Sequence, residues 1–250
     1  MVALPDGILM SAEEYLVWEP TQEQRYEYWD GEVVAMSGGT RNHNRVSGNF
    51  FKLLDDALAE RSCEVYIVDV KVQVEAGQNY FYPDVVVTCD DRDRDPQLVQ
   101  FPCLIIEVLS PSTEAADRGK KFAKYRQSPT LQEYVLVQVT QPGVEVFRRN
   151  EQGKWVLWDY NLGDKLRLES VDVEIAIADL YRQVQFETEV TYTLELNGQI
   201  FMIENVPARV NEETGEQFFS PSTVEHLQQI ILSGQQPDHF TEVPVYNYAA

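Results

Sequence analysis

The stretch Cys103-Leu-Ile-Ile-Glu-Val-Leu109 decides how this sequence folds. Its apolar residues follow one another without alternation, which is typical of a strand buried on both faces inside a sheet. A single acid, Glu107, interrupts the run. A carboxylate buried without a partner is energetically costly, so it requires a metal ion, a cation or hydrogen-bond donors. We therefore expect Glu107 to face a polar site; the alternative is a solvated or salt-bridged strand end.

A second acid, Asp84, stands near the start of another predicted strand. Pro83 precedes it and three valines follow, and proline is tolerated at the first residue of a strand. If the two strands are neighbours, the carboxylates of Asp84 and Glu107 can converge at one end of the sheet. Two such carboxylates suit Mg²⁺ or Mn²⁺, which prefer oxygen ligands and retain water. Either ion, bound in this way, activates water for attack on phosphorus.

The apolar pattern around these strands predicts a mixed α/β domain. Val46, Phe50 and Leu54 recur at helical spacing and predict a helix over residues 41–60. An Asp-Gly pair at 30–31 predicts a hairpin. The further expected elements are a helix opened by a capping box at 11–14, strands over 63–74, 82–88, 103–109 and 133–139, a helix over 114–127, a hairpin around Gly153 and a short helix within 171–184.

The predicted helix that follows Glu107 is rich in basic residues. Asp117 and Lys121 are i, i+4 neighbours on it, and residue types and spacing alone favour an exposed ion pair of little energetic weight. The alternative is that Lys121 reaches the carboxylates and orients or deprotonates a water molecule. The segment 118–126 could also contact a phosphate backbone through Arg118, Lys120, Lys121, Lys124 and Arg126.

Five segments, in the same order along the chain, resemble the Uma-type restriction endonucleases, a branch of the PD-(D/E)XK nuclease superfamily. The resemblance covers about residues 8–187. It implies a restriction-endonuclease-like mixed sheet flanked by helices and a divalent-metal-dependent endonuclease. The segments are Tyr26-Glu-Tyr-Trp-Asp-Gly-Glu-Val33, Pro83-Asp-Val-Val-Val87, Leu104-Ile-Ile-Glu-Val-Leu-Ser-Pro111, Asp117-Arg-Gly-Lys-Lys-Phe-Ala-Lys-Tyr125 and Glu133-Tyr134.

The resemblance implies an active site made of Asp84, Glu107 and Lys121. Pro83-Asp84 resembles the PD element and Glu107 the second acid, so Asp84 and Glu107 are the expected ligands of Mg²⁺ or Mn²⁺. The usual lysine position holds Leu109. The lysine is therefore expected from the next helix.

The lysine assignment and two further positions remain open at this point. Lys121 matches the lysine best, and Lys120 and Lys124 are the alternatives. Glu27 and His43 resemble further family positions near the cleft. The plain interpretation is that Glu27 is an exposed hairpin residue and His43 a residue of a helix N-terminus.

Composition sets limits on partners and location. The formal net charge of −21 counts against binding nucleic acid by general electrostatics. No apolar run approaches the roughly 20 residues that cross a bilayer, and Met1 to Met10 do not resemble a secretory signal. Three separated cysteines without a CxxC pair indicate reduced thiols. We expect a cytoplasmic protein with no membrane partner that acts on nucleic acid. DNA is the expected substrate, and the sequence leaves RNA open as the alternative. A homodimer is expected because duplex cleavage needs two cuts.

The sequence divides into an expected nuclease domain over 1–187 and a small acidic extension over 188–250. Asn197-Gly198 predicts a hairpin and Ser220-Pro221 the start of a helix. Residues 203–221 are similar to the latter part of YgiT-type zinc-finger antitoxins, although Asn211 and Thr214 replace the CxxC cysteines, so zinc binding should be lost. The extension is then a dimerisation or docking module, or packs on the main domain.

Two other functions stay open beside the nuclease. The acidic charge and the antitoxin-like segment suggest a catalytically silent nuclease fold that serves as a binding or regulatory protein. Two carboxylates also suit a glycosidase. Such enzymes do not require the lysine, so the pattern gives that alternative little support.

Overall fold

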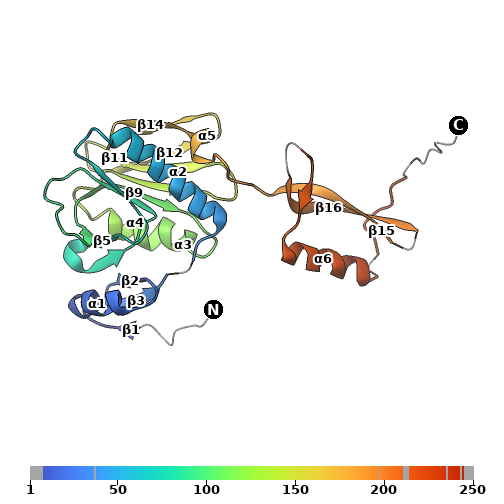
Figure 1. The fold of residues 1–250 in the computed structure, drawn as a ribbon, viewed down its shortest axis with the longest axis horizontal. Coiled ribbons are helices and arrows are strands. Elements are labelled where there is room, and N and C mark those ends of the chain that lie inside the picture. The colour runs from blue at the N-terminus through green and yellow to red at the C-terminus, as the bar shows by residue number, and fades with distance from the viewer. Residues whose placement is uncertain are drawn as a thin grey trace. The chain divides into compact units, whose positions relative to one another are not determined.

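The computed structural model describes residues 8–36, 38–196, 198–210, 214–234, 236–242 and 244. The chain forms two compact units, Met1–Val184 and Gln185–Ala250, whose elements are drawn in Figure 1. Among the described residues, no helix has both the length and the apolar character needed to span a membrane.

The first unit is a mixed α/β fold with two six-stranded sheets among its described residues. The central sheet has the order β12 (Trp155–Tyr160), β11 (Val144–Arg149), β10 (Glu133–Val137), β9 (Pro102–Val108), β7 (Val85–Thr88) and β4 (Glu64–Ile67). In this sheet, β9 and β10 run parallel and the other neighbours are antiparallel. The second sheet has the order β1 (Ile8–Leu9), β3 (Glu32–Ala35), β2 (Tyr26–Trp29), β6 (Asn79–Phe81), β5 (Lys71–Val74) and β8 (Leu98–Val99).

Helix α2 (Arg41–Leu58) covers one face of the central sheet, as Figure 1 shows. Thr40 caps it by accepting a hydrogen bond from the backbone N–H of His43. Its apolar stripe is fully buried at Val46, Phe50 and Leu54 against β4, β7 and β9. The helix predicted over 41–60 is confirmed, and its N-terminus is fixed beside the sheet end that carries Asp84.

The opposite face of the central sheet packs against a helical segment and the second sheet. α3 (Glu114–Ala116), a π-helical turn (Asp117–Lys121) and α4 (Phe122–Tyr125) follow one another without a break. Phe122 stacks on Tyr134 of β10, with ring centroids 5.0 Å apart. One helix was predicted over 114–127, and the structure adds the π turn within it. Such turns recur at functional sites.

The remaining elements of the first unit follow the local signals. The capping box of Ser11 and Glu14 is present at the start of the first helix, and the hairpins β2–β3 and β11–β12 are formed as predicted. The other elements are α1 (Ala12–Trp18), the 3-10 turns η1 (Glu19–Thr21) and η2 (Glu75–Gly77), β13 (Lys165–Leu168), β14 (Val173–Ala176) and α5 (Ile177–Leu180).

The single strand predicted over 63–74 is wrong. The chain turns at Val68 and Asp69, which have φ angles of 40° and 53°, so that β4 joins the central sheet and β5 the second. The apolar residues stand at odd positions in β4 (Val65 and Ile67) and at even positions in β5 (Val72 and Val74), so the alternation changes phase between Ile67 and Val68. Residues two apart share a face of a strand, so this change of phase marks the turn, and the prediction of one strand overlooked it.

The prediction of three reduced cysteines is also wrong, because Cys63 and Cys89 form a disulfide. β4 pairs with β7 in a register that places Glu64 opposite Thr88. One step further along this register, Cys63 lies opposite Cys89. Cys103 is the free cysteine, and its sulfur lies 3.7 Å from that of Cys89.

Alkylation tests this sulfur cluster. Burial raises the pKa of Cys103 to about 11, and the thiolate is the nucleophile. Without reductant, iodoacetamide should modify Cys103 slowly at neutral pH and about tenfold faster per pH unit up to that pKa. Peptide mass spectrometry identifies the modified residue. Rapid modification of Cys63 or Cys89 in the unreduced native protein would contradict the disulfide.

The second unit is a long hairpin with one helix. It contains β15 (Thr188–Leu196), β16 (Gln199–Val210), β17 (Gln217–Phe218) and α6 (Pro221–Leu232). The predicted hairpin and the Ser220 cap are confirmed, while Asn197 and Asn211 lie outside the described residues. Its described core consists of Val206, Ala208 and Leu227.

Candidate active site

Glu107 lies inside the first unit on β9, with 3% of its surface exposed. Residues two apart on a strand share a face, so Glu107 points to the same side as Ile105, toward α4. There its Oε1 accepts a hydrogen bond of 3.3 Å from the Tyr125 hydroxyl and lies 3.0 Å from Nζ of Lys121. The prediction that Glu107 has a polar partner is confirmed, because a cation and a hydroxyl group both contact its carboxylate.

Asp84 stands one residue before β7. The pair Val85–Ile106 in the β7–β9 register, extended by one residue, places Asp84 beside Glu107 at the sheet end. Its Oδ2 accepts a hydrogen bond of 2.7 Å from the backbone N–H of Val108. The same oxygen lies 3.2 Å from Nε2 of His43, so the first turn of α2 contributes a side chain to this end of the sheet.

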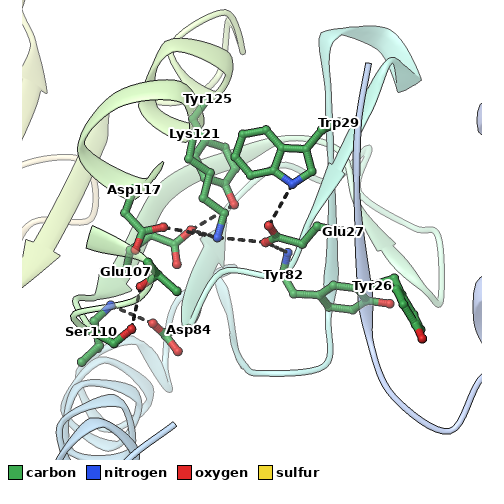
Figure 2. Close-up of polar contacts among 12 residues, drawn as sticks. Tyr26, Glu27, Trp29, Tyr82, Asp84, Glu107, Ser110, Asp117, Lys121 and Tyr125 are labelled. Carbon is green, nitrogen blue, oxygen red and sulfur yellow. Dashed lines mark hydrogen bonds and ion pairs between the residues drawn. The ribbon is translucent and has the colours of Figure 1, made fainter. Parts of the chain in front are cut away.

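Lys121 is the centre of the cluster, as Figure 2 shows. Its Nζ lies 2.9 Å from Glu27, 3.0 Å from Glu107 and 3.5 Å from Asp117. The prediction of an exposed Asp117–Lys121 pair is wrong, because 3% and 7% of these two residues are exposed. The π turn that contains both directs them inward.

The structure distinguishes the three candidate lysines by position. Lys120 points to solvent. Lys124 pairs with Asp30 at 2.8 Å and Glu75 at 3.0 Å, away from the cluster. Lys121 is the one that enters it.

Glu27 is buried, and its plain interpretation as an exposed hairpin residue is wrong. Its Oε2 accepts a hydrogen bond of 3.2 Å from the Trp29 indole, and its Oε1 one of 3.2 Å from the backbone N–H of Tyr82. β2 lies between β3 and β6, so both of its edges are paired. Only the family resemblance indicated that Glu27 lies near the site, because a single acid in a hairpin strand gives no sign in the sequence that it is buried.

The local charge balance is negative. Burial raises the pKa of Glu107 well above its usual range, and although Lys121 lowers it, the charges of Asp117, Asp84 and Glu27 raise it further. Burial also raises the pKa of Asp117. Burial opposes the charged form of Lys121, but the surrounding carboxylates outweigh this effect and raise its pKa well above the usual value. Lys121 is therefore an ammonium at neutral pH.

His43 is the second basic group of the site. Burial lowers its pKa, but the hydrogen bond and the charge of Asp84 outweigh burial, so the pKa is raised overall. The contact with Asp84 therefore both orients the imidazole ring of His43 and favours the protonated form of that ring. The plain interpretation placed it at a helix N-terminus, which is correct, and that N-terminus adjoins the carboxylates.

The carboxyl groups of the site are the candidate ligands for a divalent ion. In the described part of the chain, no three or more histidine, cysteine or acidic side chains are arranged as a group that could hold a metal. Asp84 and Glu107 nevertheless place two carboxyl groups at the same end of the sheet, with Asp117 and Glu27 nearby. Mg²⁺ and Mn²⁺ bind through one or two carboxylates and keep several waters, so the chemistry of these residues fits such an ion.

The basic segment 118–126 is largely neutralised. Arg118 pairs with Glu145 and with Glu114 at 2.7 Å, and Lys121 and Lys124 are held by carboxylates as described above. Lys120 and Arg126 are the basic residues of the segment that remain exposed. The segment is therefore a weaker candidate for phosphate contacts than its sequence suggested.

A mixed sheet with acids on neighbouring strands and a lysine from the following helix defines a nuclease-like α/β fold. The chain belongs to the Uma2 family, described as "Putative restriction endonuclease", whose model matches residues 12–179. This match covers the helices and strands that carry all the site residues named above.

Relatives and a solved structure resemble the same region. Two uncharacterized proteins of Synechocystis sp. (strain ATCC 27184 / PCC 6803 / Kazusa) are similar: slr1290 is 43% identical over 71% of this chain and 94% of its own length, and sll1609 is 32% identical over 68% and 97%. The crystal structure of "a putative nuclease belonging to DUF820" from Anabaena variabilis ATCC 29413 shares the fold, with a TM-score of 0.57 and 17% identity over 69% of this chain and 98% of that one.

Removing the shared ammonium should destabilise the fold. In Lys121→Met, the carboxylates of Glu27, Glu107 and Asp117 lose their cation, and breaking a buried ion pair costs about 3–5 kcal/mol. Without the ammonium, the buried carboxyl groups are tolerated only when they are protonated, that is, below their raised pKa. The loss of unfolding free energy relative to wild type should therefore be largest at neutral pH and should shrink as the pH falls. Urea unfolding measures it. Lys120→Met, at an exposed site, should change the free energy of unfolding by less than about 0.5 kcal/mol; an equal effect of both variants would contradict the buried cluster.

Proposed function

We propose that this chain is a divalent-metal-dependent endonuclease whose active site is formed by Asp84, Glu107 and Lys121. One observation carries the proposal: a buried lysine shares carboxylates from three separate elements next to the Asp84 sheet end. A purely structural salt bridge does not need this surplus of acids. Membership of a family described as putative restriction endonucleases supports the reaction class.

In this proposal the residues have distinct roles. Asp84 and Glu107 hold Mg²⁺ or Mn²⁺, which would neutralise phosphate charge and lower the pKa of bound water. The raised pKa of Lys121 excludes it as the base at neutral pH. It acts instead as a hydrogen-bond donor that orients the attacking water and offsets negative charge. His43 holds Asp84 in place through the 3.2 Å contact.

Isosteric variants test the site. Asp84→Asn and Glu107→Gln keep side-chain shape but remove a charged oxygen ligand, so each should reduce Mn²⁺-dependent cleavage of labelled DNA by at least about 100-fold. Circular dichroism should show an unchanged fold. Glu32→Gln, at an exposed residue of β3, is the matched control and should cleave like wild type. Full cleavage by both site variants would refute the assignment.

A catalytically silent binding or regulatory protein is the second candidate. The neutralised basic segment and the net charge of −21 favour it, as does the resemblance of residues 203–221 to a cysteine-less YgiT-type antitoxin segment. Calorimetric titration with Mn²⁺ distinguishes the two functions. The endonuclease requires binding that Asp84→Asn abolishes, whereas the silent protein predicts no binding, or binding that this substitution leaves unchanged.

The proposal includes DNA as substrate, a homodimer and a cytoplasmic location. Two active sites in one assembly would cut both strands of a duplex. Disulfides are rare in reducing compartments, so the Cys63–Cys89 bond is the observation that bears most directly on location. Labelling of free thiols in intact cells, before lysis, would report whether this bond exists where the protein acts.

A further inference from the structure

The edge strand β12 exposes an unusual amount of apolar surface. It ends the central sheet among the described residues. Val156 is 39% exposed, Leu157 47% and Trp158 50%, and Leu162 just beyond the strand is 64% exposed. Soluble proteins usually protect such an edge with charges, proline or a bulge. The six residues of β12 contain one charge, Asp159, and no proline.

Both faces of the edge share this character. Val156 and Trp158 lie on one face and Leu157 on the other, because successive side chains alternate. Arg148 lies beneath Trp158, with its guanidinium carbon 5.6 Å from the ring centroid. A ligand that only stacked on one aromatic ring would leave the opposite face uncovered. A paired strand covers both faces and also satisfies the free backbone groups of the edge.

The β12 sequence is complementary to itself. In an antiparallel pair related by a two-fold axis, a residue can lie opposite only a residue of the same face, so the pairing centres on a single position. Centred on Leu157, the register places Leu157 opposite its own copy and each Val156 opposite a Trp158. Apolar and aromatic–β-branched cross-strand pairs of this kind stabilise antiparallel sheets.

Charge complementarity supports the same register. Arg149 pairs with Trp155 across β11 and β12, and its guanidinium carbon lies 4.9 Å from the Trp155 ring centroid. Its donors reach backbone carbonyl oxygens, and its Nε is buried without a hydrogen-bond partner among the described residues. The register centred on Leu157 brings Asp159 of the second copy opposite Trp155. A carboxylate thereby approaches Arg149, which has no carboxylate partner among the residues that the structure describes.

We propose that two copies of this chain pair antiparallel through β12, centred on Leu157, and join their central sheets into one continuous sheet. This assigns an interface to the homodimer of the proposed function. The interface is independent of the cleavage chemistry, because the β12 edge contains none of the proposed catalytic residues. An experiment can therefore contradict the proposed interface without contradicting the proposed cleavage activity, and the reverse also holds.

Molar mass in solution tests the pairing. Light scattering after gel filtration of the full chain should give twice the 28.8 kDa of one chain. Leu157→Lys places two like charges directly opposite each other, which is destabilising, and should give a single chain of 28.8 kDa with unchanged circular dichroism. Leu162→Lys is the matched control outside the strand and should remain a dimer. A monomeric wild type, or a dimer that survives Leu157→Lys, would overturn the proposal.

Cross-linking tests the register. In the full chain, Leu157→Cys should form a dimer band on a non-reducing gel, because the two new sulfurs face each other. Asp159→Cys should not, since its copies lie four residues apart along the strands, about 13 Å. Cross-linking of Asp159→Cys alone would overturn the register. A monomeric wild type whose tryptophan fluorescence is quenched by a single-stranded oligonucleotide would instead assign the edge to base stacking.

Discussion

The contact between one buried ammonium and three carboxylates is the constraint on which the first unit depends. Glu27 comes from β2 of the second sheet, Glu107 from β9 of the central sheet and Asp117 from the π turn. None of these acids could remain ionised in this interior without a cation. Lys121 therefore fixes how the second sheet, the central sheet and the helical segment meet. The geometry of the site and the packing of the core are determined by the same interaction.

Much of this arrangement could be predicted because its signals are local. The hairpin at Asp30-Gly31, the helix beginning at Arg41 and the strand around Glu107 each follow from residues adjacent in sequence. The apolar flanks of Glu107 also predicted that this acid would need a partner. Spacing alone assigned Lys121 to an exposed pair, since an i, i+4 acid–lysine pattern is the same on an exposed and on a buried helix face. The family resemblance, rather than the spacing, indicated this lysine.

The features that sequence reasoning missed depend on contacts between distant segments. Glu27 is buried because β2 is paired on both edges, and a hairpin pattern does not report the second neighbour. Cys63 and Cys89 are separated by 26 residues and meet only because β4 and β7 pair in one register. That register in turn requires the chain to turn at Val68 and Asp69. Each of these errors has the same origin, which is that strand pairing is decided by tertiary structure.

The acidity of the chain is compatible with the proposed chemistry. A phosphodiester is an anion, and the site presents it with Glu27, Asp84, Glu107 and Asp117 against the single ammonium of Lys121 and, when protonated, His43. Without further positive charge this site would repel its substrate. A divalent ion on Asp84 and Glu107 would offset most of that negative charge at the point of reaction. The surplus of carboxylates that counts against general nucleic-acid binding is therefore the same property that makes the proposed activity depend on a metal.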